Sequence, residues 1–227
     1  MVSLAVPLLA ACAVGPDSGD DLALVGDSTI AGKGDGQCAT VSANIAPTAP
    51  PPFACGPVDS LASSLLADIN GFWGSHVGAC NCIGDYDGPC RGASSRFELG
   101  WIYLEPGFIQ RVSSEINTTV GSYALAHELG HELQGHNGVD VDGPLIGLEL
   151  GADCLAGYYL GGKMCDEGIA DRDLQATLDF ACSIADGNGD PVHDRNSHGT
   201  CDQRMSAIKQ GIAAYQQRKA PLAGCRF

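Results

Sequence analysis

A segment of thirteen residues, ALAHELGHELQGH from Ala124 to His136, constrains the fold of this chain more than any other. It contains two histidines four residues apart, among residues typical of a buried helix. Positions four apart lie on one face of an α-helix, separated by about 6 Å along its axis. We therefore expect the side chains of His127 and His131 to point to the same place from the middle of a helix.

His127, Glu128 and His131 form a His-Glu-x-x-His motif. This spacing lets both imidazoles bind one zinc ion, while the glutamate takes a proton from a zinc-bound water molecule. Zinc lowers the pKa of that water to about 7, so a carboxylate is a sufficient base near neutral pH. A chance match on a solvated helix face is the alternative. The apolar flanks argue against it, namely Ala124, Leu125, Leu129 and Leu133.

His136 is a poor candidate for the third ligand. It lies nine residues past His127, which at about 100° per residue is half a turn away from the metal-binding face. A histidine third ligand also requires a His-x2-Gly-x2-His continuation, but this chain has Gln134 and Asn137 at the two positions. We expect His136 to face solvent or to cap the helix locally.

Glu149 is the predicted third ligand. It lies 18 residues beyond His131, which is enough chain for a turn and a returning helix. Asp153 follows one helical turn later on the same face, where it could accept the second N–H of a ligand histidine. This Glu-x3-Asp arrangement is similar to that of the gluzincin class of metallopeptidases. Two histidines and a glutamate leave a fourth position for water, which is typical of a catalytic site, although ELGAD could also be an ordinary acidic helix start.

The hydrophobic pattern predicts a mostly helical α+β domain with a small β-sheet. Apolar residues recur every four positions in the first helical segment and alternate over the predicted strand, which Pro106 ends. Gly135 is the expected cap of the helix that carries the motif. We expect a loop over residues 78–94, a strand over 96–106, and helices over 57–77, 106–116, 119–135, 144–162, 171–186 and 200–219.

The N-terminal segment indicates export. Its residues 1–12, MVSLAVPLLAAC, resemble the lipobox of bacterial lipoproteins, in which the cysteine, here Cys12, is lipidated. No Lys or Arg precedes the apolar run, so an ordinary secretory signal or a chance apolar start stays open. Residues 13–52 are rich in Asp, Gly, Ser, Ala and Pro and predict a flexible spacer. The folded domain is expected over residues 53–227, and the spacer would hold it away from a membrane.

The net charge and the cysteine content limit the partners and the cellular compartment that this protein can have. The formal net charge of −15 argues against a nucleic-acid partner, because a phosphate backbone would be repelled. Removing Cys12 from the 11 cysteines leaves an even set, which predicts disulfides in an oxidising compartment. Two alternatives stay open: metal binding by Cys80, Cys82 and Cys90, and a free thiol at Cys154.

Four stretches carry a resemblance to the bacterial neutral zinc metallopeptidase family: IYLEPGFIQ, ALAHELGHELQ, ELGADCLAGYY and HGTCDQRMSAIKQG. The resemblance implies a zincin-like fold, zinc held by His127, His131 and Glu149, and Glu128 as the general base. It also implicates His198 and Arg204. His198 is a candidate donor to the oxyanion of the reaction. Arg204 is expected to pair with a carboxylate and hold the last helix in place.

These observations predict an exported zinc metallopeptidase, anchored by lipid in the bacterial cell envelope, that hydrolyses peptides or proteins. The chain departs from the family at Glu132, where the family often has a further histidine. The alternative is a non-catalytic envelope protein for binding or assembly that keeps the zincin fold, with zinc structural or absent. The intact Glu128 favours the enzyme.

Overall fold

The computed structural model describes residues 31–32, 39–40, 45–48, 54–83, 92–95, 100–139, 144–186, 197–225 and 227. The helices in these ranges are α1 (Ser60–Trp73), α2 (Phe108–Glu115), α3 (Thr118–His136), α4 (Leu145–Asp166), α5 (Asp171–Ser183), α6 (Cys201–Gln216) and α7 (Pro221–Gly224). The strands are β1 (Ala31–Gly32), β2 (Ala39–Thr40), β3 (Cys55–Gly56), β4 (Gly78–Cys82), β5 (Ala93–Ser95) and β6 (Trp101–Leu104). The predicted fold class, mostly helical α+β with a small sheet, is confirmed.

The main sheet has the strand order β3-β4-β6-β5, which leaves β5 at one edge. β6 runs parallel to β4 and antiparallel to β5. Side chains alternate along β6, as a strand with two covered faces requires. Ile102 and Leu104 join the main core, whereas Tyr103 packs against Cys80 and Cys82 on the other face.

The loop predicted over residues 78–94 is wrong at both ends, because β4 occupies its start and β5 begins before its end. β4 has the sequence GACNC and lacks alternating large apolar residues. Cys80 is instead bonded to Cys55 of β3, and Cys82 is also disulfide-bonded. Because disulfides hold this strand in place, its sequence lacks the alternating hydrophobic pattern from which a strand could be predicted. The same bonds exclude the alternative in which Cys80 and Cys82 bind a metal.

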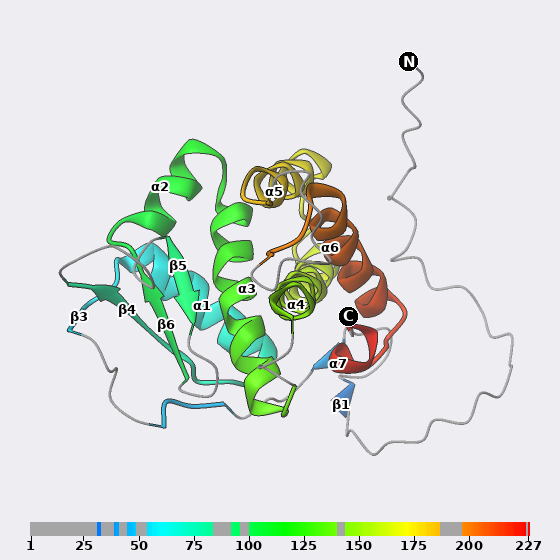
Figure 1. The fold of residues 1–227 in the computed structure, drawn as a ribbon, viewed down its shortest axis with the longest axis horizontal. Coiled ribbons are helices and arrows are strands. Elements are labelled where there is room, and N and C mark those ends of the chain that lie inside the picture. Colours follow the sequence, from blue (N-terminus) through cyan, green and yellow to red (C-terminus); the bar gives the residue numbers. More distant parts are fainter. Residues whose placement is uncertain are drawn as a thin grey trace, which may run out of the picture.

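α3 is the central element, with the sheet, α1 and α2 on one side and α4 to α7 on the other (Figure 1). Every residue from Val120 to Gly135 is buried, so the helix is covered around nearly its whole circumference. The side chain of Asn117 caps its start by accepting a hydrogen bond from the Val120 N–H at 3.0 Å. The predicted cap at Gly135 is wrong, because the helix continues to an exposed His136.

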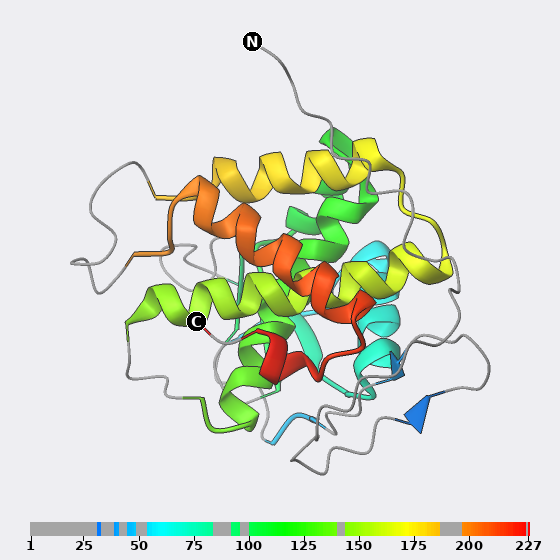
Figure 2. The same ribbon diagram turned by 90° about the vertical axis from the view of Figure 1, so that its right-hand side faces the viewer.

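α4 lies across α6 at a close crossing (Figure 2). The predicted end of α4 at Gly162 is wrong, since the helix runs on to Asp166. The glycines near its C-terminal end allow neighbouring residues to pack closely, and they do not end the helix. A Cβ at Gly161 would lie 3.0 Å from that of Tyr215, and one at Gly162 would overlap the ring of Phe72.

Two further disulfides join the helices to one another. Cys154 of α4 is bonded to Cys225 after α7, so the alternative of a free thiol at Cys154 is wrong. Cys182 of α5 is bonded to Cys201 of α6. With Cys55–Cys80, these make three disulfides in which both cysteines are described, and such a number is typical of a protein exported to an oxidising compartment.

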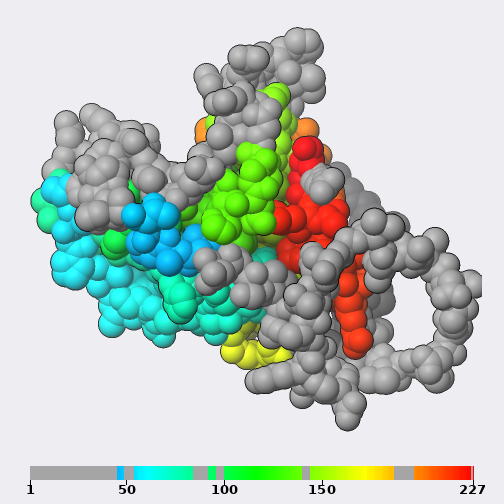
Figure 3. Space-filling view, turned by 90° about the horizontal axis from the view of Figure 1, so that it is seen from below, coloured from blue at the N-terminus to red at the C-terminus, as the bar shows by residue number. Residues whose placement is uncertain are grey.

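One residue of the predicted spacer, Ile45, touches the folded domain. Ile45 is buried in the main core, and its carbonyl accepts a hydrogen bond from the His76 N–H at 2.6 Å. Seen from below, residues 45–48 in blue lie near the green end of α3, with the C-terminal residues in red beside it (Figure 3). The predicted lipidation site, Cys12, lies outside the described residues.

Two glycine substitutions, one at the α4–α6 crossing and one on the exposed surface of α1, should change stability in opposite directions. A Cβ at Gly211 would overlap the carbonyl oxygen of Cys154, so we expect Gly211→Ala to lower the free energy of unfolding by about 3 kcal/mol. Gly71, exposed in α1, has no neighbouring atom near the position that a Cβ would take, and Gly71→Ala should raise stability by about 0.5 kcal/mol. Urea unfolding of both variants measures the difference. Equal effects would contradict the close crossing.

Candidate metal centre

His127, His131 and Glu149 converge where α3 meets α4. One ligand atom from each lies within 4.8 Å of the ligand atoms of the other two. Nε2 of His127 is 3.3 Å from Oε2 of Glu149, and Nε2 of His131 is 3.5 Å from Oε1. All three side chains are buried and line a cleft. The sequence therefore identified a set of side chains that the fold does bring together.

The charges of this cluster favour a cation. Burial by itself would lower the pKa of His127, yet hydrogen bonds and charges from Asp153 and Glu149 raise it to about 10. Burial would likewise raise the pKa of Glu149, but hydrogen bonds with the two histidines lower it. Carboxylates that favour a proton on an imidazole also favour a metal ion at its nitrogen. Two imidazole nitrogens and one carboxylate oxygen, facing an open cleft, are a donor set that suits zinc.

Asp153, fully buried on α4, orients the first histidine. Its Oδ1 lies 2.8 Å from Nδ1 of His127 and accepts a hydrogen bond from the Tyr123 hydroxyl at 2.5 Å. Arg204 on α6 donates from Nε to Oδ2 at 2.8 Å and from Nη2 to Oδ1 at 2.9 Å. The expected pairing of Arg204 with a carboxylate is thereby confirmed.

The protonation state of this network follows from its charges. Burial would raise the pKa of Asp153, but hydrogen bonds and charges from Arg204 and His127 hold it below the ordinary value. Asp153 is therefore an ionised acceptor and takes the hydrogen bond of His127 Nδ1–H. When His127 gives up its second proton, the hydrogen bond to Asp153 keeps the remaining proton on Nδ1, so the lone pair of Nε2 would be directed at the cluster, as a metal ligand requires.

The second histidine has a different partner. Nδ1 of His131 lies 3.1 Å from Oε1 of Gln134, one turn further along α3. Nε2 of Gln134 in turn donates to the carbonyl of Leu148 on α4 at 2.9 Å. Gly151 leaves the space that Gln134 occupies, because a Cβ there would overlap the amide nitrogen. Gln134 thus links the orientation of His131 to the position of α4.

Glu128 lies beside the cluster between α3 and β5. It is 8% exposed and lines the same cleft as the two histidines. Burial raises its pKa, while the charges of His127 and His131 and a backbone hydrogen bond with Ser95 of β5 act in the opposite direction. A raised pKa helps a carboxylate to keep a proton that it has accepted until the proton is passed on.

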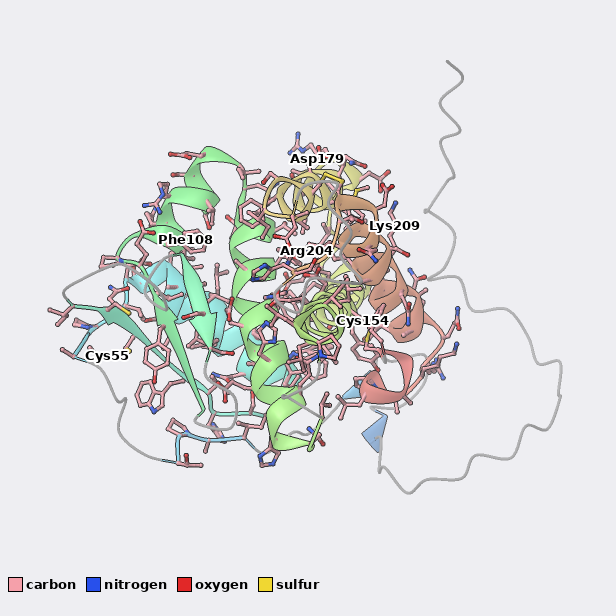
Figure 4. All side chains as sticks on the ribbon, viewed as in Figure 1. Cys55, Phe108, Cys154, Asp179, Arg204 and Lys209 are labelled. Carbon is pink, nitrogen blue, oxygen red and sulfur yellow. A yellow bond between two sulfur atoms is a disulfide. The ribbon has the colours of Figure 1, made fainter. Side chains whose placement is uncertain are left out.

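The cleft has a volume of about 540 Å³ and two distinct sides. α3 and the start of α4 form its floor. β5 and Phe108 line one side, while Phe180, Ile184, His198 and Arg204 line the other. Figure 4 shows Phe108 and Arg204 on opposite sides of α3. A segment of peptide laid across α3 would contact both sides.

His198 lies at the edge of this cleft, with its side chain 48% exposed. Asp186 holds it: the backbone N–H of His198 donates to Oδ2, and Nδ1 lies 3.5 Å from Oδ1. The ring therefore belongs to the cleft but not to the three-ligand cluster. Its predicted role as a donor to the oxyanion stays a prediction.

Sequence reasoning missed three contributors to the site, namely Tyr123, Gln134 and Ser95. Tyr123 and Gln134 carry a detectable signal, because they lie on the motif helix four residues before His127 and three after His131. Ser95 carries none, since its contact with Glu128 depends on the position of an edge strand that the hydrophobic pattern did not predict.

Residues 92–220 match the protein family described as "putative neutral zinc metallopeptidase". The match covers more than half of the chain, from β5 to the end of the segment after α6. The chain belongs to this family. Its fold is accordingly zincin-like, and the buried cluster is compatible with the zinc that the family description names. Neither a curated protein nor a solved structure matches the chain.

Removing Arg204, the cation of the buried pair with Asp153, should lower the free energy of unfolding substantially. Arg204→Met leaves the Asp153 carboxylate buried without its main partner, so we expect a loss of about 3 to 5 kcal/mol in the free energy of unfolding. Arg111→Met breaks the exposed pair with Glu105 and should cost at most about 1 kcal/mol. Chemical unfolding with disulfides intact compares the two variants. A loss at Arg204 no larger than that at Arg111 would contradict this account of the network.

Proposed function

We propose that this protein is a zinc-dependent metallopeptidase that hydrolyses peptide bonds in its cleft. The observation that carries the proposal is the convergence of His127, His131 and Glu149 beside a buried Glu128. The cleft next to these residues is large enough to hold several residues of an extended peptide. The family description supports zinc as the metal.

His127, His131 and Glu149 would hold the zinc ion. Zinc in such a set polarises a carbonyl group and lowers the pKa of a water molecule. Asp153 and Gln134 keep the two imidazoles in the orientation that binding requires, since each contacts the Nδ1 atom that faces away from the cluster.

Glu128 would act as the general base. Its carboxylate takes a proton from the attacking water and then delivers it to the nitrogen of the leaving amine. Its raised pKa, caused by burial, suits both steps. Because the backbone of Ser95 also contacts Glu128, the carboxylate is held between the motif helix and the edge strand.

His198 would supply a hydrogen-bond donor at the opposite side of the cleft. Asp186 contacts its backbone N–H and lies near Nδ1, which leaves Nε2–H for the negative oxygen that develops at the attacked carbonyl. Arg204 has a supporting role, because its guanidinium is committed to Asp153 and Tyr123.

Two substitutions separate the metal ligand from the base. Glu128→Gln should abolish hydrolysis of a mixed peptide library while zinc content stays near one per chain, because the base is lost and the ligands are kept. Glu149→Ala should lose most of the zinc. Glu115→Gln, an exposed site outside the cleft, is the control and should behave as the wild type.

Zinc analysis and peptide mass spectrometry measure the two properties. Full zinc occupancy in Glu149→Ala would remove Glu149 as a ligand. Peptide cleavage by Glu128→Gln at the wild-type rate would remove Glu128 as the base. No cleavage by the zinc-loaded wild type on any peptide would favour a binding or assembly protein.

We also propose that the protein is exported and anchored to the envelope membrane by a lipid on Cys12. The disulfides support export, and the apolar run that ends in Leu9-Ala10-Ala11-Cys12 supports the anchor. Among the described residues, no helix is long and apolar enough to cross a membrane. In bacterial cells, Cys12→Ser should shift the protein from the membrane fraction to the soluble fraction. Unchanged membrane association in that variant would contradict the lipid anchor.

A further inference from the structure

One side of the cleft carries an apolar surface made by Phe180 and Ile184, here called the apolar wall. Phe180 is half-buried near the end of α5, and Ile184 follows the helix. Ile184 is 48% exposed, one of few large apolar side chains in the described residues that are so exposed. An exposed isoleucine inside a cleft offers a surface that a ligand can cover.

The apolar wall lies close to the metal ligands. The ring of Phe180 packs edge-on against Tyr123, with ring centroids 6.3 Å apart, and Tyr123 is 6.2 Å from the ring of His127. Only one aromatic ring therefore separates Phe180 from a ligand histidine. A side chain resting on the apolar wall would belong to a residue near the bond being cleaved.

The apolar wall is held in place on both flanks. Phe180 lies two residues before Cys182 and Ile184 two residues after it, and Cys182 is bonded to Cys201 of α6. The N–H of Asp186 also donates to the carbonyl of Gly199 at 3.0 Å. A surface fixed before the substrate arrives loses little freedom on binding, which favours selectivity.

The buried cation near the apolar wall, Arg204, is already paired with Asp153, and the Nδ1 side of His198 faces Asp186. A charged substrate side chain on the apolar wall would lose water without gaining a partner. A large apolar side chain would instead bury its surface against Phe180 and Ile184.

We propose that Phe180 and Ile184 determine specificity, so that the enzyme prefers a large apolar residue beside the scissile bond. This inference rests on the proposed peptidase activity. Its substrates would be peptide segments with leucine, phenylalanine or methionine at that position, with alanine and charged residues disfavoured. Burying such a side chain, compared with alanine, corresponds to a preference of about 30-fold in kcat/KM.

Peptides that differ only in the residue on either side of the scissile bond test this preference in the zinc-loaded full chain. The wild type should cleave the leucine and phenylalanine peptides about 30-fold faster than the alanine peptide, in terms of kcat/KM. Ile184→Ser should reduce this ratio to a few-fold while zinc content stays unchanged. Ile184 is mostly exposed, so this variant should fold. Phe180→Ala should reduce the ratio further.

Ile116→Ser is the matched control, because Ile116 is 44% exposed and lies outside the cleft. It should keep the wild-type ratio. Cleavage by the wild type without an apolar preference, or a ratio unchanged in both Ile184→Ser and Phe180→Ala, would overturn this inference and leave the peptidase standing. No cleavage of any peptide by the zinc-loaded wild type would overturn both.

Discussion

The carboxylate of Asp153 is the group on which the rest of the structure depends. It is fully buried, and removing an ion from water costs several kcal/mol unless its partners compensate. Here the partners are Arg204, Tyr123 and His127, which come from two other helices. The contacts that satisfy the charge therefore also fix the relative positions of α3, α4 and α6. They orient His127 as well, so stability and the metal centre share one interaction.

The packing around this network brings the backbones of three helices into close contact beside the cleft. Gly157 and Gly211 allow the backbones of α4 and α6 to touch, and Gly130 does the same for α3 and α4. α3 is consequently buried over most of its length, and the cleft is where its polar residues meet solvent. Disulfides that join α5 to α6 and α4 to the C-terminal segment add covalent links outside the cluster. Catalytic groups held by rigid helices keep their geometry better than groups on loops.

Much of the centre could be predicted from sequence, because helical periodicity relates its residues. His127 and His131 lie one turn apart, and so do Glu149 and Asp153. Which carboxylate pairs with Arg204 could not be predicted, since 51 residues separate it from Asp153 and only the fold joins them. The strands were harder to predict from sequence, because β4 is held by disulfides and β5 has only three residues. Glycines misled the prediction of helix ends, because in α4 they serve close packing.

X-ray absorption spectroscopy of the zinc-loaded protein tests the central claim most directly. The account predicts two imidazole nitrogens at about 2.0 to 2.1 Å, one carboxylate oxygen and one exchangeable water. A small hydroxamate should displace that water and change the spectrum. Sulfur in the zinc shell would contradict the ligand set of His127, His131 and Glu149. A fourth protein ligand that no hydroxamate displaces would show a closed, structural site and contradict the proposed hydrolysis.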